Sequence, residues 1–314
     1  MTKNPGGRLL CIRLRTKYET SLDKNGAITM QRIAVVIVTF NNSSMLRNVL
    51  LDLAAQSYPV DTTVVVDNAS IDDTPRMMSE EFTYVTYIRL TDNAGSAGGY
   101  YTGVKTVMAV ADGIWTLDDD VRLKPDSLKN LLAGYQELSK TCRLGAVRSV
   151  NTDYPHSGPI ELEIAPWRAT LWAGNVVRLM GLPRDDYFLY GEDIEYSLRM
   201  RKLGYCCCLV SSSHCSETRK GKTDKQFFGR SVRIYPTPFR LYYAFRNEMS
   251  IYLTYHRIDK LARLCLFTLK VIGYVALTER TTALRKIEAV LIGLAHGLIG
   301  RLGKNPRFLP TIPF

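Results

Sequence analysis

The chain has 314 residues, of which 46% are hydrophobic, so it can bury one large core or one domain with an appendage. Its formal net charge of +11 favours an anionic partner such as a nucleotide, a nucleic acid or an acidic membrane surface. Ten Lys or Arg and three Asp or Glu fall between Tyr255 and Phe314, so about two thirds of the excess lies in the last fifth of the chain. No ladder of basic and aromatic residues accompanies it, so we expect no nucleic-acid partner.

The seven cysteines do not predict a disulfide framework, because their number is odd and Cys206 to Cys208 are consecutive. Such usage is typical of a reducing cytoplasm. A zinc site made from these three with His214 and Cys215 would lack paired C-x-x-C spacing, so small buried strand residues are the simpler interpretation. Residues 1–30 are basic without an apolar run of signal-peptide length, and we expect a disordered extension there.

Strands and helices alternate along the first half of the chain. The β-branched run Ile33–Val38 predicts a strand that is covered on both faces. Further strands are predicted at Thr63–Val66, Tyr84–Leu90 and Gly113–Leu117, with helices around Leu46–Leu53, after Thr74 and over Tyr101–Val110. This alternation predicts an α/β fold with a doubly wound, mostly parallel sheet.

Polar side chains follow the predicted strands where each strand ends. They are Thr39, Asp67, Asn93 and the run Asp118 to Asp120. In open α/β sheets, ligands bind beyond the carboxyl ends of the strands. Because four separate strand ends carry polar groups, we expect these groups to converge on one site.

Three consecutive aspartates, Asp118, Asp119 and Asp120, follow an apolar run. Adjacent carboxylates repel one another unless a cation lies among them. Their oxygens suit a hard divalent ion, which can in turn bind a diphosphate. A solvated acidic turn is the alternative, but turns seldom contain three acids in succession. The cluster therefore predicts a metal site for a nucleotide leaving group.

Further motifs could contact a nucleotide. The glycine-rich run Asn93–Gly99, which includes Gly98, opens a helix, so its amides could lie close to a ligand, although a flexible loop is the alternative. It lacks the G-x-G-x-x-G spacing and follows the third strand, which disfavours a Rossmann dehydrogenase. Asp67 and Asn68 could bond to a base or ribose, or could simply form a turn. Thr39 and Asn41 raise the same ambiguity.

Aromatic residues lead into the acidic pair Glu192 and Asp193, at the start of a helix predicted over Glu192–Leu203. The positive end of a helix stabilises ionised carboxylates, and a carboxylate there can act as general base toward an acceptor hydroxyl. Acids also cap helices for structural reasons, and Glu195 is the best candidate for that role.

Trp172 and Tyr190 could offer flat faces to an acceptor sugar, although an aromatic is more often part of a core. His214 follows the apolar stretch Cys206–Val210 and could be a third metal ligand or a structural histidine.

Beyond Phe239 the sequence becomes helical, aromatic and basic. The segments Leu261–Leu277 and Ile287–Leu302 could lie on an anionic membrane surface, or could form a helical subdomain or an oligomer interface. No stretch of eighteen apolar residues is free of charge, so we expect no spanning helix. We divide the chain into the extension 1–30, a catalytic domain 31–235 and a basic helical region 236–314.

Together these motifs resemble the family 2 inverting glycosyltransferases of the GT-A fold. The matching landmarks are Ile37–Asn41, Val66–Ser70, Asn93–Gly99, Leu117–Asp120 and Gly191–Asp193, within roughly residues 32–220. The run Gly181–Arg199 is most similar to bacterial galactofuranosyltransferases, with rhamnosyltransferases close behind. Arg246-Asn247 also resembles a downstream pattern of bacterial members.

The resemblance implies a role for each matching position. Asp118, Asp120 and His214 would hold Mn²⁺ or Mg²⁺ on the donor diphosphate. Asp193 would be the catalytic base, with Glu192 beside it on the acceptor. The positions that would contact the donor are Thr39, Asn41, Asp67 near the base, Asn68, Asn93, Gly98, and Asp119 near the ribose or sugar.

The resemblance implies a cytoplasmic enzyme, peripheral on the inner face of the cell membrane, that moves galactofuranose from its UDP donor onto a cell-surface glycan or lipid-linked saccharide. Rhamnose transfer from a dTDP donor is the alternative within the class. A sugar-nucleotide pyrophosphorylase would need a glycine- and basic-rich loop after the first strand, where this chain has Thr39 to Asn42. A non-catalytic glycan-binding protein would not need both the aspartate triplet and the Glu192-Asp193 pair.

Overall fold

A computed structural model describes residues 30–151, 158–217, 224–227, 230–233, 235–279 and 281–309. The extension expected at the amino terminus lies outside the described residues, apart from Met30, whose side chain is buried.

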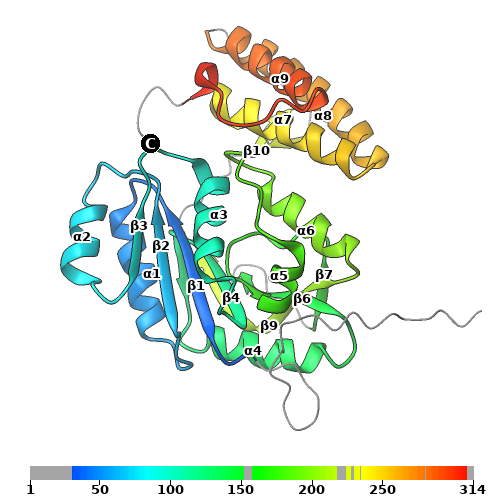
Figure 1. Ribbon diagram of the computed structural model, residues 1–314. Coiled ribbons are helices and arrows are strands. Elements are labelled where there is room, and N and C mark those ends of the chain that lie inside the picture. The colour runs from blue at the N-terminus through cyan, green and yellow to red at the C-terminus, as the bar shows by residue number, and fades with distance from the viewer. Residues whose placement is uncertain are drawn as a thin grey trace, which may run out of the picture.

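A nine-stranded sheet forms the centre of the fold (Figure 1). Its order is β3-β2-β1-β4-β8-β6-β9-β5, and β7 pairs with β9. The first four strands of this order are parallel, as are β6 and β9, whereas β8 runs antiparallel to both of its neighbours. The strands are β1 Ile33–Thr39, β2 Thr62–Asp67, β3 Thr86–Arg89, β4 Gly113–Asp118, β5 Val121–Leu123, β6 Leu144–Asn151, β7 Ile160–Leu162, β8 Thr170–Ala173 and β9 Cys206–Glu217. The predicted fold class is confirmed.

Helices cover both faces of the sheet and join its strands (Figure 1). In chain order they are α1 Ser43–Ala54, α2 Thr74–Glu81, α3 Gly95–Val107, α4 Ser127–Leu138, α5 Gly174–Met180 and α6 Glu192–Lys202. The run Ile33–Ile37 of β1 is at most 3% exposed, as expected for a strand covered on both faces. The aliphatic side chains of β1, β2 and β4 therefore form the centre of the main core.

Helix α3 begins at Gly95, six residues before the start predicted at Tyr101. Its glycines allow it to lie close to the sheet. A Cβ at Gly99 would lie 2.4 Å from a methyl group of Val38, and one at Gly103 would lie 2.3 Å from a methyl group of Val36. The glycine-rich run is therefore helical and closely packed, which corrects the alternative of a flexible loop.

The remaining helices, α7 Pro238–Thr254, α8 Ile258–Thr278 and α9 Ala283–Leu298, form a separate layer with its own core (Figure 1). A hairpin of β10 Asp224–Phe227 and β11 Arg230–Arg233 precedes them, so the boundary predicted between residues 235 and 236 falls between β11 and α7. Lys304 pairs with Asp92, which follows β3, at 2.6 Å. The helical layer therefore reaches the carboxyl edge of the sheet.

Helix α8 is long and apolar enough to cross a membrane by length and composition, with a mean hydropathy of 1.6. This finding differs from the expectation of no spanning helix, because an apolar window that includes only Arg263 and Lys270 as charged residues is still long enough. Helices in the cores of soluble proteins pass the same test. One side of α8 is buried here, through Leu264, Thr268, Val271 and Val275.

Candidate active site

The carboxyl ends of three adjacent strands carry the first group of polar residues. Thr39 ends β1 and pairs with Asp67 of β2, while Val38 pairs with Asp118 of β4. The next two aspartates form the turn into β5. The strand ends thus meet along one edge of the sheet, as the topology rule predicts.

Asp119 turns toward the end of β1. Its Oδ2 accepts a hydrogen bond from the Thr39 hydroxyl at 2.7 Å. The pKa of Asp119 is raised to about 7, mainly by burial and also by the charges of Asp120 and Asp118, against the lowering effect of hydrogen bonds from Thr39 and Asn42. A carboxyl group in this position is a strong candidate for a functional role, because a cation or a donor hydroxyl would favour its ionised form.

Tyr100 of α3 holds Asp118 in place. No pattern in the sequence indicated this role. Its hydroxyl lies 2.9 Å from both the Leu117 carbonyl oxygen and Oδ1 of Asp118. Its ring stacks on Trp167 with 4.6 Å between centroids. Burial holds the pKa of Tyr100 well above its usual value, so the phenol stays protonated and donates.

The acidic pair stands at the first turn of α6. Ser96 of α3 donates a hydrogen bond of 2.5 Å to Oε1 of Glu192, whose side chain is 4% exposed. The other oxygen, Oε2, is buried without a hydrogen-bond partner among the described residues. The pKa of Glu192 is raised to about 8, mainly by burial and also by the charges of Asp193 and Asp118. Asp193 of α6 and Asp118 of β4 are therefore both close enough for their charges to affect Glu192.

The glycine-rich run ties this pair to the sheet. Gly95 has a φ of +72°, and a Cβ there would lie 1.8 Å from the Phe188 carbonyl oxygen, so only glycine fits. Ala97 donates its amide to that same oxygen at 3.2 Å. Asn68, at the end of β2, donates to the Gly95 carbonyl and accepts from the Ala94 amide. Asn68, which the sequence predicted to contact the nucleotide-sugar donor, thus orients the start of α3.

Three other predicted donor residues hold turns. Asn93 accepts a hydrogen bond from the Gly95 amide at 2.8 Å. Asn41, with a φ of 49°, accepts one from the Ile71 amide at 2.7 Å. Gly98 donates its amide to Ala94 inside the first turn of α3 and lines a cavity of about 370 Å³ on the side of that helix. Their contacts with a donor stay predictions.

Asp67 is fully buried, and protein groups occupy both of its oxygens. Tyr87 donates to Oδ2 at 2.5 Å and the Ser70 amide donates to Oδ1 at 2.8 Å. Arg89 lies 3.6 Å from Oδ2. This geometry is that of the turn which the sequence left open. A base could bond to Asp67 only by displacing one of these partners, so its role stays a prediction.

Trp172 corrects a prediction. Its side chain is 1% exposed, its indole nitrogen donates to Thr116 at 3.0 Å, and its ring packs against Trp167 and Tyr196. It therefore belongs to the core and offers no face to an acceptor. β8, which carries it, pairs with two strands inside the sheet, and an isolated Trp in the sequence gives no signal of that position.

Tyr190 lies beside the helical layer. Its hydroxyl accepts a hydrogen bond of 2.6 Å from Arg240, and its ring lies 4.9 Å from that of Tyr235. It is half-buried, with a φ of 66°. Its place between the acidic pair and α7 is compatible with an acceptor contact, which stays a prediction.

His214 lies on β9 opposite Val150 of β6, with an exposed side chain. Among the described residues, the predicted ligands Asp118, Asp120 and His214 do not form a group of three ligand atoms within 4.8 Å of one another. Within the described part of the chain, the group of three possible ligands whose atoms lie within 4.8 Å of one another is Cys142, Cys206 and Cys208. Cys206 begins β9, at the edge of the sheet opposite the aspartates. The metal-ligand set therefore stays a prediction.

Arg246 and Asn247 of α7 hold the segment before the acidic pair, and both are fully buried. Nδ2 of Asn247 lies 3.0, 2.9 and 2.6 Å from the carbonyl oxygens of Tyr187, Leu189 and Tyr190. Arg246 donates to Tyr187 at 2.8 Å and to Oδ1 of Asn247 at 2.8 Å. The resemblance had pointed to this pair without indicating what it does.

Comparisons with known proteins agree with this architecture. Residues 34–188 match the family model of Glycosyl transferase family 2. The galactofuranosyltransferase GlfT1 of Mycolicibacterium smegmatis is 24% identical over 57% of this chain and 69% of its own length. GlfT1 of Mycobacterium tuberculosis is 25% identical over 69% of this chain and 81% of its own length.

Two solved structures share the fold. TarS 1-349 of S. aureus in complex with UDP-GlcNAc has a TM-score of 0.59 at 14% identity, over 85% of this chain and 81% of that one. The mannosyltransferase PcManGT of Pyrobaculum calidifontis, in complex with GDP-Man and Mn²⁺, has a TM-score of 0.55 at 15% identity, over 85% of this chain and 87% of that one. With the family match, these likenesses identify the protein as a glycosyltransferase with a family 2 domain of the GT-A fold.

Proposed function

We propose that this enzyme transfers galactofuranose from UDP-galactofuranose onto a hydroxyl of a cell-surface glycan or lipid-linked saccharide, with inversion at the anomeric carbon. The similarity to two galactofuranosyltransferases supports the choice of sugar. The observation that carries the chemistry is geometric: Ser96 and Tyr100, one turn apart on α3, hydrogen-bond to Glu192 of α6 and to Asp118 of β4, so one helix holds both acids.

A divalent cation, Mn²⁺ or Mg²⁺, fits these residues. Asp118, Asp119 and Asp120 are consecutive, and the charges of Asp118 and Asp120 both raise the pKa of Asp119. Such an excess of negative charge favours a hard cation with oxygen ligands. Asp118 and Asp120 would hold it, with Tyr100 orienting Asp118. When bound, the ion would stabilise the charge that accumulates on the departing nucleoside diphosphate.

The residues of the chain itself would supply the acceptor half of the reaction. Asp193, half-buried at the positive end of α6, would take the proton from the acceptor hydroxyl as that oxygen attacks the anomeric carbon. The helix end favours the ionised form that a base needs. Glu192, held by Ser96 and with a raised pKa, would stay protonated near neutral pH and donate a hydrogen bond to the acceptor.

The test is a donor panel. Purified enzyme is incubated with Mn²⁺, a mixture of bacterial membrane glycolipids and one nucleotide sugar at a time, and nucleoside diphosphate release is measured. UDP-galactofuranose should give the fastest release. Faster release with dTDP-rhamnose would overturn the proposed sugar. Absence of release from every nucleotide sugar would overturn the proposed activity, and unchanged release after treatment with EDTA would overturn the role of the cation.

We also propose that the enzyme works at the inner face of the cell membrane, where lipid-linked acceptors would reach it. The helical layer supports this proposal, because large apolar side chains of α8 and α9 are exposed while Lys and Arg lie on the same helices. Leu266 and Leu269 of α8 are 61% and 68% exposed. The opposite side of α8 packs against α7 and α9, which favours a helix that lies on the surface over one that crosses it.

Flotation with acidic liposomes tests the membrane proposal. The double variant Leu266→Glu, Leu269→Glu should lose most of the binding of the wild type. Leu51→Glu is the matched control, because Leu51 is 54% exposed but lies on α1 of the catalytic domain. Equal flotation of the double variant and the control would refute the proposed surface.

A further inference from the structure

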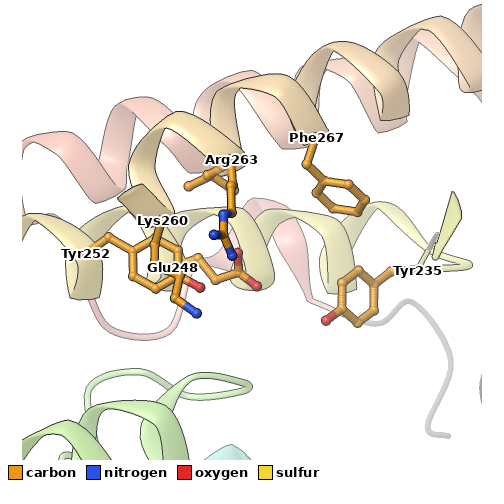
Figure 2. A pocket seen from close by; sticks show the side chains of 7 residues that line it. Tyr235, Glu248, Tyr252, Lys260, Arg263 and Phe267 are labelled. Carbon is orange, nitrogen blue, oxygen red and sulfur yellow. The ribbon is translucent and has the colours of Figure 1, made fainter. Parts of the chain in front are cut away.

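A cavity of about 360 Å³ lies between α7 and α8 (Figure 2). Its lining residues are Tyr235, Glu248, Tyr252, Lys260, Arg263, Leu264 and Phe267. Figure 2 shows Arg263 and Phe267 reaching from α8 toward Glu248 and Tyr235. This volume falls in the range of small-molecule sites, which is about 300–1,000 Å³. None of these residues is one of the acids at the end of β4 or the start of α6.

The cavity combines three aromatic side chains with charged groups that have no fixed partner. Neither Glu248 nor Arg263 forms an ion pair or side-chain hydrogen bond with the described residues. Burial raises the pKa of Glu248 to about 7 despite the opposing charge of Lys260. Its carboxyl group can therefore both donate and accept a hydrogen bond near neutral pH. Aromatic faces next to such groups suit a sugar ring, which has apolar faces and a rim of hydroxyls.

The cavity adjoins the segment that carries the proposed base. Tyr235, in its wall, lies with its ring 4.9 Å from that of Tyr190. Glu248 directly follows Asn247, whose side chain binds the Tyr190 carbonyl oxygen at 2.6 Å. Two residues separate Tyr190 from Asp193 along the chain. A saccharide that occupied the cavity would thus extend toward Asp193, the proposed base that activates its reacting hydroxyl.

The charge of the cavity argues against a phosphate as its occupant. Lys260 is already paired with Glu163 at 2.9 Å, which leaves Arg263 as the cation without a partner among the described lining residues. Glu248, when ionised, would repel an anion. A neutral polyhydroxylated ligand meets no such repulsion and can use both groups.

We propose that this cavity is a subsite for the saccharide of the acceptor, holding a sugar next to the one that receives the transferred residue. The proposal rests on the proposed function, because it presupposes a glycan acceptor. Tyr235, Tyr252 and Phe267 stack on the ring, and Glu248 and Arg263 bond to its hydroxyls. The helical layer thereby recognises the acceptor, while the edge of the sheet binds the donor.

Binding and kinetics test the proposal on the full chain. Octyl galactofuranosyl-galactofuranoside serves as the probe in calorimetric titrations of the wild type, Glu248→Gln and Arg263→Ala. Arg285→Ala is the control, because Arg285 is exposed on α9 outside the cavity. Loss of a charged hydrogen bond should weaken probe binding about tenfold or more in Arg263→Ala, with a smaller loss in Glu248→Gln. The control should bind as the wild type does.

The same variants separate this inference from the proposed function. In transfer assays with UDP-galactofuranose, the KM for the probe should rise in Glu248→Gln and Arg263→Ala and should stay at the wild-type value in Arg285→Ala. Unchanged probe affinity in both variants would overturn the subsite, even with donor turnover intact. Probe binding that inorganic phosphate displaces would overturn the choice of a neutral saccharide. Absence of donor turnover in the wild type would instead count against the proposed function.

Discussion

Replacement of Asn247 by Ala tests how the helical layer supports the site. The side chain is fully buried on α7, and it is the donor that the structure gives to the carbonyls of Leu189 and Tyr190. The Tyr187 carbonyl would keep Arg246 as donor. Asn247→Ala therefore leaves the carbonyl groups of Leu189 and Tyr190 without this donor. It also removes the oxygen that accepts the hydrogen bond from Nε of Arg246.

The expected cost follows from these contacts. Each buried polar group that loses its partner costs about 1–3 kcal/mol, and water can reach some of the three, so we expect a loss of about 2–4 kcal/mol in the free energy of unfolding. The segment is also strained, because Phe188 and Tyr190 have φ values of 64° and 66°. Such residues cost about 1–3 kcal/mol each and persist only where their surroundings fix them. The segment should therefore relax in the variant, displacing Glu192 and Asp193.

Urea unfolding measures the first effect and transfer assays measure the second. Asn130→Ala is the control, because the side chain of Asn130 donates an exposed hydrogen bond to the Ser212 carbonyl. Its free energy of unfolding should change by less than about 1 kcal/mol. The reasoning fails if Asn247→Ala unfolds like this control and also transfers sugar at the wild-type rate.

Three further predictions concern the acids. Asp193→Asn should bind the donor normally but lose about two to four orders of magnitude in transfer rate, since it removes the general base; near-normal transfer would refute that role. Asp120→Ala should abolish Mn²⁺-dependent donor binding in calorimetry, and undiminished Mn²⁺-dependent affinity would count against its metal role. The pKa of Glu192 in the folded protein is about 8, above its usual 4.5, so folding favours its neutral carboxyl group. In the metal-free protein this contribution to stability is fully present below pH 4.5 and is lost as the pH rises through about 8. Glu192→Gln should therefore flatten the fall of unfolding free energy over that range, by at most about 1.4 kcal/mol per pH unit; parallel curves for variant and wild type would contradict the raised pKa.

The sequence predicted the parallel half of the sheet well, because its signals are local. Ile33–Val38 is β-branched and bounded by polar residues, and β1 extends only one residue beyond it. The start of α3 was placed too late, because Gly95 and Gly99 are typical of loops in sequence, while their close packing on Phe188 and on β1 is a tertiary property. Helix propensity alone does not register such packing.

The sequence predicted the acidic residues of the site but not the residues that hold them in place. Asp118 and Glu192 are found by charge and by position at strand and helix ends. Ser96 lies in the glycine-rich run and Tyr100 directly after it, and neither carries a charge, so no pattern in the sequence singles out these two partners of the acids. Trp172 was misassigned for the converse reason: an aromatic residue has the same appearance in sequence whether it lines a core or a cleft.

The supports explain why the acids need the C-terminal helices. Gly95 approaches the Phe188 carbonyl from the sheet side, and Asn247 binds the carbonyls on either side of Phe188 from the helical side. The segment that ends in Glu192 and Asp193 is thus held between two elements about 150 residues apart in sequence. Phe188 and Tyr190, both with left-handed φ values, lie in this segment and need fixed surroundings to persist. The orientation of the acidic pair is therefore a property of the contact between the two layers, and changes in α7 should alter acceptor activation before they alter donor binding.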